Sequence, residues 1–110
     1  MDIQYSNKKV EKIFSDWEEM KKQISYDWVK KIKRYLDAIK ASDTFQVFLS
    51  TGLDHQESLT GFDKPTWTLR ISPNARLIFE IDDKDPKKSK NIIVKGVFDD
   101  HGGKYNWYIS

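Results

Sequence analysis

Residues 61–81 read GFDKPTWTLRISPNARLIFEI, and this stretch decides the fold because it predicts a β-hairpin. Side chains alternate between two faces along a strand, so apolar residues two positions apart share one face. That apolar face comprises Trp67, Leu69 and Ile71 in the first arm and Leu77, Phe79 and Ile81 in the second. The turn between the arms contains Pro73, which presets its own φ, and Asn74, which tolerates a positive φ.

The number of residues in the turn decides which side chains share a face. A two-residue loop at 73–74 would set Ile71 opposite Arg76 and would mix apolar with charged side chains. A loop of odd length aligns the two apolar sets and brings Arg70 and Arg76 together on the other face. We therefore favour the odd loop, which predicts one apolar face and one face with a pair of arginines, a candidate anion site.

Composition places the chain among folded proteins. Its 110 residues are enough for one core, with 38% hydrophobic residues and four Trp, five Tyr and six Phe, so we predict a single domain over residues 1–110. The absence of cysteine excludes disulfides and thiolate metal sites and favours a cytoplasmic location. The sequence has no apolar segment suited to a signal peptide or a transmembrane helix, so no membrane partner is expected.

The charge of the chain is nearly balanced. A net charge of +2 arises from 19 basic and 17 acidic residues, and this excess does not by itself indicate nucleic-acid binding. The Lys- and Glu-rich helix faces are expected to be solvated surfaces. Any RNA-binding role therefore depends on local clustering of basic side chains.

Hydrophobic periodicity predicts the order of the remaining elements. The expected helices are residues 7–23, 25–41 and 44–49, with Ser25 and Asp43 as N-caps of the last two. The expected strands are residues 3–5, the two hairpin arms, the nearly continuous apolar run 92–98, and 104–109. The expected loops are residues 53–64 and 82–90. The predicted architecture is α+β, with an N-terminal short strand and a helical hairpin packed on one face of a mainly antiparallel four-stranded sheet.

The candidate site combines basic side chains with the end of the last long strand. Its members are Arg70, Arg76, Lys64, His55 and the Asp99-Asp100-His101 terminus. Metal-free RNA cleavage needs a proton removed from a 2′-hydroxyl, charge stabilised on the phosphate, and a proton given to the 5′-oxygen. Histidine suits the proton steps because its ordinary pKa of about 6.5 lies near neutrality, and arginine suits the phosphate because its fork matches two oxygens.

The residues alone leave two features of this site undecided. A carboxylate beside the histidine, from Asp99 or Asp100, could fix its tautomer. Lys95 has the same parity as His101, so a regular pleat would place both on one side of the sheet, and alternation does not say whether that is the arginine side. Arg70 and Arg76 are also compatible with ordinary exposed or salt-bridged strand residues.

The sequence has no motif for a metal or a cofactor. It contains no Gly-rich phosphate loop, nucleophile elbow, metal-binding His pair or zinc-ligand spacing. We therefore expect neither a metal nor a cofactor.

The order and spacing of several short segments resemble the RelE/HigB superfamily of bacterial toxins, and most closely its HigB, or plasmid-maintenance killer, branch. The resemblance covers roughly residues 3–101 and includes the predicted order of a short strand, two helices and a third helical piece before the hairpin. Its specific parts are Leu59-Thr60-Gly61, residues 67–71 (WTLRI), residues 75–79 (ARLIF) and residues 97–101 (VFDDH).

This resemblance implies a small α+β fold that holds RNA on the sheet face opposite the helices. Such toxins typically cut mRNA on the translating ribosome without a metal, and a partner antitoxin silences them. By position, Arg70 matches the arginine of the first hairpin strand and Arg76 the one that opens the second. Asp99 or Asp100 with His101 matches the closing acid and histidine, although Asp100 stands where many HigB-like toxins have tyrosine.

The leading hypothesis is a cytoplasmic, ribosome-dependent mRNA endoribonuclease of a type II toxin–antitoxin system. In this hypothesis Arg76 stabilises the transition state, His101 is the general acid or base, and Asp100 (or Asp99) orients the histidine. The phosphate-binding or rRNA-binding residues would be Arg70, Lys64, His55 and Lys95. The expected partners are the ribosome, mRNA and a helix-turn-helix antitoxin.

Two alternatives have the same fold. One is a non-nuclease gyrase poison that resembles the ParE branch, for which Arg76 and His101 would be dispensable. The other is a catalytically inactive module that only engages an antitoxin, and the replacement of tyrosine by Asp100 favours it.

Overall fold

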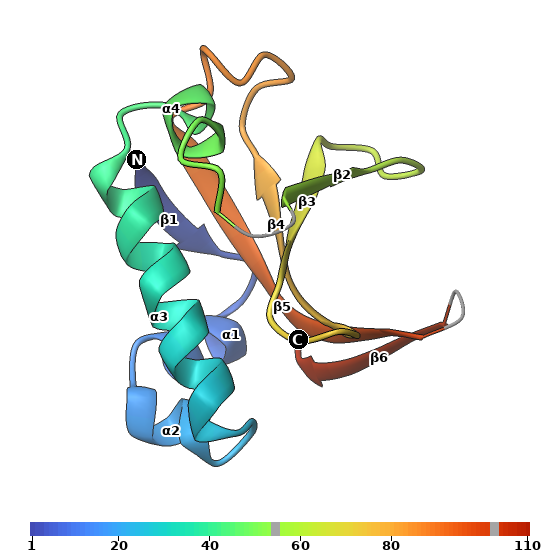
Figure 1. Ribbon diagram of the computed structural model, residues 1–110. Helices are drawn as coiled ribbons and strands as arrows, with labels where there is room; N and C mark the ends of the chain where they lie inside the picture. Colours follow the sequence, from blue (N-terminus) through green and yellow to red (C-terminus); the bar gives the residue numbers. More distant parts are fainter. Residues whose placement is uncertain (54–55, 102–103) are drawn as a thin grey trace.

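The computed structural model describes residues 1–53, 56–101 and 104–110, with the backbone alone at 101, 104 and 105. In these ranges the helices lie along one face of a strongly curved sheet, and no helix lies on the opposite face (Figure 1). The helices are α1 (Lys8–Phe14), α2 (Trp17–Lys21), α3 (Tyr26–Ala41) and α4 (Phe45–Leu49). The strands are β1 (Asp2–Tyr5), β2 (Gln56–Leu59), β3 (Thr66–Arg70), β4 (Ala75–Ile81), β5 (Asn91–His101) and β6 (Lys104–Ile109). No helix in the described ranges has both the length and the apolar character needed to span a membrane.

The predicted α+β class is confirmed, but the sheet is larger than expected and mixed. Six strands run in the order β1-β5-β4-β3-β2, with β6 also beside β5. β1 pairs in parallel with the first part of β5, where Ile3 lies opposite Ile92, and β6 pairs antiparallel with the second part. The expectation of a four-stranded, mainly antiparallel sheet was therefore wrong in the number of strands and missed the parallel pair. The apolar run in β5 did identify an interior strand, which has neighbours on both edges.

The strand that was not expected, β2, lies in the segment 53–64 that was predicted to be a loop. It pairs antiparallel with β3, with Gln56 opposite Leu69. Its sequence, Gln-Glu-Ser-Leu, has no β-branched residue and no apolar alternation, as suits a short edge strand with exposed central side chains. Its strand conformation depends on pairing with β3 and has no local signal.

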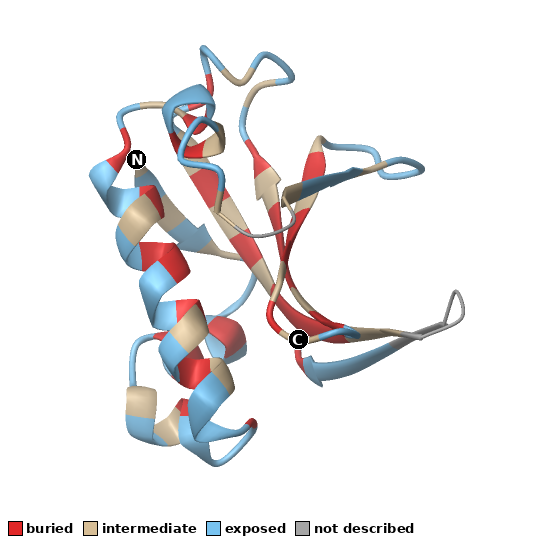
Figure 2. Ribbon diagram, in the orientation of Figure 1, coloured by how far each residue is buried: buried red, intermediate tan, exposed pale blue. Residues whose placement is uncertain are grey.

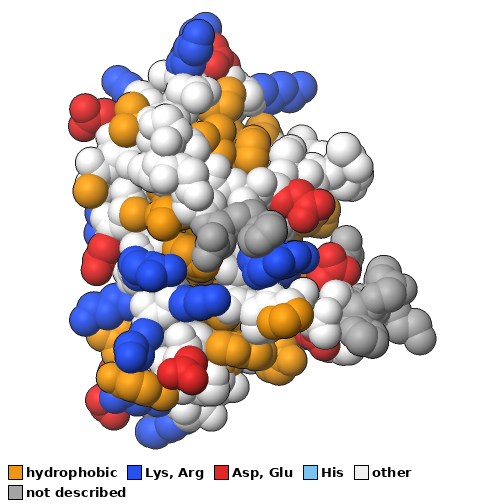
Figure 3. All heavy atoms as spheres, viewed as in Figure 1, with side chains coloured by type: hydrophobic (Ala, Val, Ile, Leu, Met, Phe, Trp, Pro, Cys, Tyr) orange, Lys and Arg blue, Asp and Glu red, His pale blue; other side chains and the backbone are white. Residues whose placement is uncertain are grey.

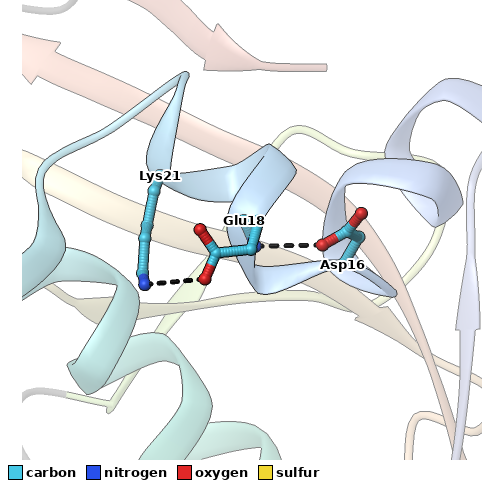
Figure 4. Close-up of polar contacts among 3 residues, drawn as sticks. All are labelled: Asp16, Glu18 and Lys21. Carbon is cyan, nitrogen blue, oxygen red and sulfur yellow. Dashed lines mark hydrogen bonds and ion pairs between the residues drawn. The ribbon is translucent and has the colours of Figure 1, made fainter.

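Residues 7–23, expected to form one helix, form two. α1 ends at Phe14 with Ser15 as its C-cap, and Asp16 then adopts an extended conformation with φ −137°. The Asp16 carboxylate accepts a hydrogen bond from the Glu18 N–H at 3.0 Å, and Glu18 pairs with Lys21 at 3.0 Å (Figure 4). A short acidic side chain competes for backbone N–H groups, so Asp16 caps a new helix.

The predicted N-cap is correct for one of the next two helices. Ser25 is the N-cap of α3 as predicted, although its side chain makes no capping hydrogen bond. Thr44, and not the expected Asp43, caps α4, because its hydroxyl accepts a hydrogen bond from the Val47 N–H at 3.3 Å.

The register of the β3–β4 hairpin confirms the odd turn. Trp67 lies opposite Phe79, and Arg70 lies opposite Arg76. Within the turn, the Ile71 N–H donates to the Ala75 oxygen at 2.8 Å. The apolar sets therefore share the helix side of the sheet, and the arginines share the other side.

The hydrophobic core lies between the helices and this apolar sheet face, where buried residues of the two layers meet (Figure 2). Phe45 of α4 packs edge-on against Trp67 and Phe79, with ring centroids 5.1 and 5.8 Å apart. The short helix α4 thereby covers the end of the sheet that α3 does not reach (Figure 1).

A β-bulge interrupts β5 at residues 95–96. Ile78 lies opposite Gly96 but Phe79 lies opposite Val94, so Lys95 has no partner in β4. Gly96 has φ +146°, and a Cβ built there would lie 1.9 Å from the backbone oxygen of Ile109 in β6. Only glycine suits this position, because both the φ and the close approach of β6 exclude a side chain.

We expect Gly96→Ala to lower the free energy of unfolding by more than about 2 kcal/mol, since backbone strain and a backbone clash add together. Gly61→Ala is the matched control: φ is +86° there, but nothing lies within 4 Å of the new Cβ, so strain of about 1 kcal/mol acts alone. Urea unfolding of both variants measures the difference. Equal losses of unfolding free energy in the two variants would contradict the tight contact between β5 and β6.

The side chain of Asp82 accepts several hydrogen bonds from the far end of the loop between β4 and β5. Asp82 accepts hydrogen bonds from the Ser89 hydroxyl at 2.7 Å and the Lys90 N–H at 3.1 Å. It also accepts from the backbone and side-chain nitrogens of Asn91, at 3.3 and 2.8 Å. Partial burial opposes ionisation, but these hydrogen bonds outweigh it and lower the pKa of Asp82.

We expect Asp82→Ala to lower the free energy of unfolding by about 1 kcal/mol at neutral pH, where the carboxylate is charged. Because the pKa of Asp82 is lower in the folded than in the unfolded state, this contribution is present above the unfolded pKa of about 3.9. It is lost as the pH falls through the folded pKa, so the two proteins should converge in acid. Asp43→Ala, at another exposed aspartate, is the control, and a difference that persists in acid would contradict the role of the charge.

Candidate functional site

We call the sheet face turned away from the helices the open face. β3, β4 and β5 contribute its side chains, as the cross-strand register and the Lys95–Glu80 ion pair establish. These side chains are Thr66, Thr68 and Arg70 of β3, Arg76, Ile78 and Glu80 of β4, and Lys95, Phe98 and Asp100 of β5.

The centre of the open face is the pair Arg70 and Arg76. The two residues are direct cross-strand partners, so their Cβ atoms lie about 4.5–5.5 Å apart and their like charges oppose each other. Both residues are half-buried, and Arg70 Nε and Arg76 Nη1 are buried without a hydrogen-bond partner among the described residues. Thr68 Oγ1, next to Arg70 on the same face, is also buried without a hydrogen-bond partner among the described residues.

Buried donors without acceptors are unfavourable by about 1–3 kcal/mol each, more for charged groups, and natural proteins rarely keep them. An anion bound between Arg70 and Arg76 would satisfy these N–H groups and relieve the repulsion of the two charges. The arrangement is therefore suited to an oxyanion such as a phosphate.

Helix α3 fixes the backbone of this pair from the other side of the sheet. The Tyr35 hydroxyl donates to the Arg70 oxygen at 2.6 Å, and Lys31 Nζ donates to the Ile71 oxygen at 3.0 Å. Figure 3 shows Lys and Arg side chains across the middle of this view, over α3 and over the neighbouring part of the sheet. Lys31, on a helix face that was expected to be solvated, thus holds the turn beside the arginines.

The bulge in β5 decides which residues reach the open face. After Gly96, Val97 pairs with Leu77 in the core, so Phe98 lies opposite Arg76 on the open face. Alternation then places Asp100 on the open face and Asp99, which pairs with Ala75, on the helix side. The pleat of β5 is not regular, so Lys95 and Val97 point to opposite faces of the sheet. The expectation that Lys95 and His101 share one side assumed a regular pleat, which β5 does not have.

The structure thus separates the two acidic candidates. The Asp100 N–H donates to the Asn74 oxygen at 2.9 Å, which sets this residue beside the hairpin turn. Asp99 Oδ1 is buried without a hydrogen-bond partner among the described residues. The backbone of His101 continues β5 and pairs with Lys104, but the His101 side chain lies outside the described part of the chain.

The remaining candidates do not join the arginine pair. Lys64 is exposed and precedes β3, at the end opposite Arg70 of a strand about 13 Å long. Lys95 lies on the open face, but its Nζ pairs with Glu80 Oε1 at 3.2 Å and its charge is largely balanced. His55 lies outside the described residues.

The sequence did not single out two aromatic residues on the open face. Phe62, from the loop between β2 and β3, is 38% exposed, and Trp107 of β6 is 45% exposed. Nothing in the sequence beyond the high aromatic content pointed to them, because Phe62 lies in a polar loop and Trp107 in the short C-terminal strand. Both line a hollow beside the arginines.

The described residues contain no group of three or more His, Cys, Asp or Glu side chains arranged to hold a metal ion. Comparisons with protein-family models, curated proteins and solved structures found no match to this chain. The chemistry of the site therefore follows from its own residues, which offer anion binding at the arginine pair.

We expect Arg76→Met to raise the free energy of unfolding at low ionic strength by about 0.5–1 kcal/mol, because it removes one of two opposed charges. Inorganic phosphate should stabilise the wild-type protein more than this variant, since only the wild type holds the anion between two guanidinium groups. Lys9→Met, which removes an exposed charge from α1, is the control for general salt effects. Urea unfolding with and without phosphate measures both effects, and a loss of more than about 1 kcal/mol in Arg76→Met would instead make Arg76 a structural residue.

Proposed function

We propose that this chain is the toxin of a type II toxin–antitoxin system and acts as a ribosome-dependent mRNA endoribonuclease. The observation that supports this proposal is the uncovered sheet face with Arg70 and Arg76 in direct register and with buried N–H donors available to an anion. The RelE/HigB-like order of the segments agrees with it. The cytoplasm is the proposed location, because the substrate is there.

In the proposed reaction the RNA phosphate lies on the arginine pair. The 2′-oxygen loses its proton and forms a bond to phosphorus, and the bond from phosphorus to the 5′-oxygen breaks as that oxygen gains a proton. Arg76 stabilises the charge that develops on the phosphate, and Arg70 holds its other oxygens. His101, at the end of the same strand as Phe98, supplies or removes a proton, and Asp100 or Asp99 orients it.

The inactive antitoxin-binding module remains a second candidate because of Asp100. A carboxylate on the open face repels a phosphate, and it cannot stack on a base as the tyrosine of many HigB-like toxins could. In this alternative the open face would be the surface that an antitoxin covers.

Induction of the gene in a bacterial host separates these possibilities. We expect growth arrest and new 5′ ends in ribosome-bound mRNA with the wild type. Arg76→Gln should reduce cleavage by about 10²–10³-fold, the usual effect of losing one transition-state donor. Lys9→Gln, the charge-matched control on α1, should remain toxic.

Three results would contradict the proposal. Normal growth with intact mRNA would favour the inactive module. DNA damage that precedes any loss of translation would favour a gyrase poison. Full toxicity of the double variant Arg76→Ala, His101→Ala would remove the site from the mechanism.

A further inference from the structure

An apolar hollow of about 80 Å³ lies on the open face next to the arginine pair. It is lined by Phe62, Ile78, Lys95, Phe98 and Trp107. These residues come from β4, β5, β6 and the loop between β2 and β3, so the hollow forms only in the folded sheet. Its lining is almost wholly apolar, although the hollow is open to solvent.

The floor of the hollow adjoins the arginines directly. Phe98 is the cross-strand partner of Arg76, and Ile78 is the next residue of β4 on the same face. Two steps along a strand span about 7 Å, so the part of the hollow that Ile78 lines begins about this far from Arg76. A ligand that occupies the hollow can therefore also reach the arginine pair.

The walls of the hollow are aromatic and incompletely buried. The Trp107 ring lies 5.6 Å from the Phe98 ring, between centroids, at an angle of 44°. On the other wall, Lys95 Nζ lies 5.8 Å from the centroid of Phe62 while it pairs with Glu80. Lys95 therefore contributes its aliphatic stem to the lining, and its charge is already neutralised.

We propose that this hollow receives one base of a single-stranded RNA whose adjacent phosphate binds Arg70 and Arg76. Aromatic side chains beside a cationic groove are the usual means of holding single-stranded nucleic acid, because every base has a flat face to stack. The cations next to the hollow favour an anionic ligand over a neutral apolar one. This inference rests on the proposed function and names the part of the substrate that the site recognises.

Trp107 lies beyond residues 3–101, which carry the family resemblance. The strand β6 that presents it is fixed by the close contact of Ile109 with Gly96. The base subsite is thus a feature of this chain and depends on its C-terminal strand.

The test uses two probes with the same phosphates: a hexaadenylate RNA and its fully abasic counterpart, each at low salt. Fluorescence anisotropy should show that the wild-type chain binds the hexaadenylate about tenfold more tightly, a typical contribution of one stacked base. Trp107→Ala should lose this preference and bind both probes alike. Phe62→Ala, a second variant in a loop, should show the same loss, and circular dichroism checks that both fold.

Two controls separate the hollow from the arginines. Tyr26→Ala removes a still more exposed aromatic ring from α3 and should leave the preference intact. Arg76→Gln should weaken the binding of both probes to a similar extent and make that binding less dependent on salt concentration.

The inference is overturned if wild-type protein binds the two probes equally, or binds neither, or if Trp107→Ala and Phe62→Ala keep the preference. A protein side chain would then be the occupant of the hollow. These results leave the proposed cleavage to be judged by the induction experiment. Conversely, a base preference in a chain that cuts no mRNA would support the subsite and overturn the proposed enzyme.

Discussion

Two like charges held directly opposite each other on neighbouring strands are the feature on which the open face depends. Arg70 and Arg76 repel, and their cross-strand placement opposes folding. Tyr35 and Lys31 of α3 hold the adjacent carbonyl oxygens, so the helix layer fixes the strand that carries the charge. The fold thus brings both guanidinium groups together before a ligand arrives, which is the preorganisation that stabilisation of an anion requires.

The bulge in β5 joins this pair to the rest of the face. Without the extra residue, alternation from Val94 would place Phe98 and Asp100 on the helix side and would expose Val97 to solvent. With it, Phe98 lies beside Arg76 while Lys95 still meets Glu80. Gly96 permits the bulge, and the same glycine admits the Ile109 backbone, so one position determines both the open face and the docking of β6.

The sequence predicted those features that follow from local periodicity. Alternation in the hairpin gave the Arg70–Arg76 register, and the apolar run indicated the interior strand β5. It could not give β2, whose strand conformation depends on pairing with β3, or the bulge, which looks like a regular strand until its partner is known. For the same reason it left Asp99 and Asp100 equivalent, and it could not bring Phe62 and Trp107, which are 45 positions apart, to one hollow.

The modest charge of the chain limits how such a face can hold RNA. The net charge is +2, and on the open face Glu80 neutralises Lys95 while Asp100 adds a negative charge. The two arginines hold one phosphate between them, and for a single strand each neutralised phosphate gives a salt-dependence slope of only about −0.7. Stacking of a base adds about 1–3 kcal/mol and depends little on salt. Under the proposed function, an RNA on this face would draw most of its affinity from aromatic contact and from a larger docking partner, and the arginines would act on the phosphate itself.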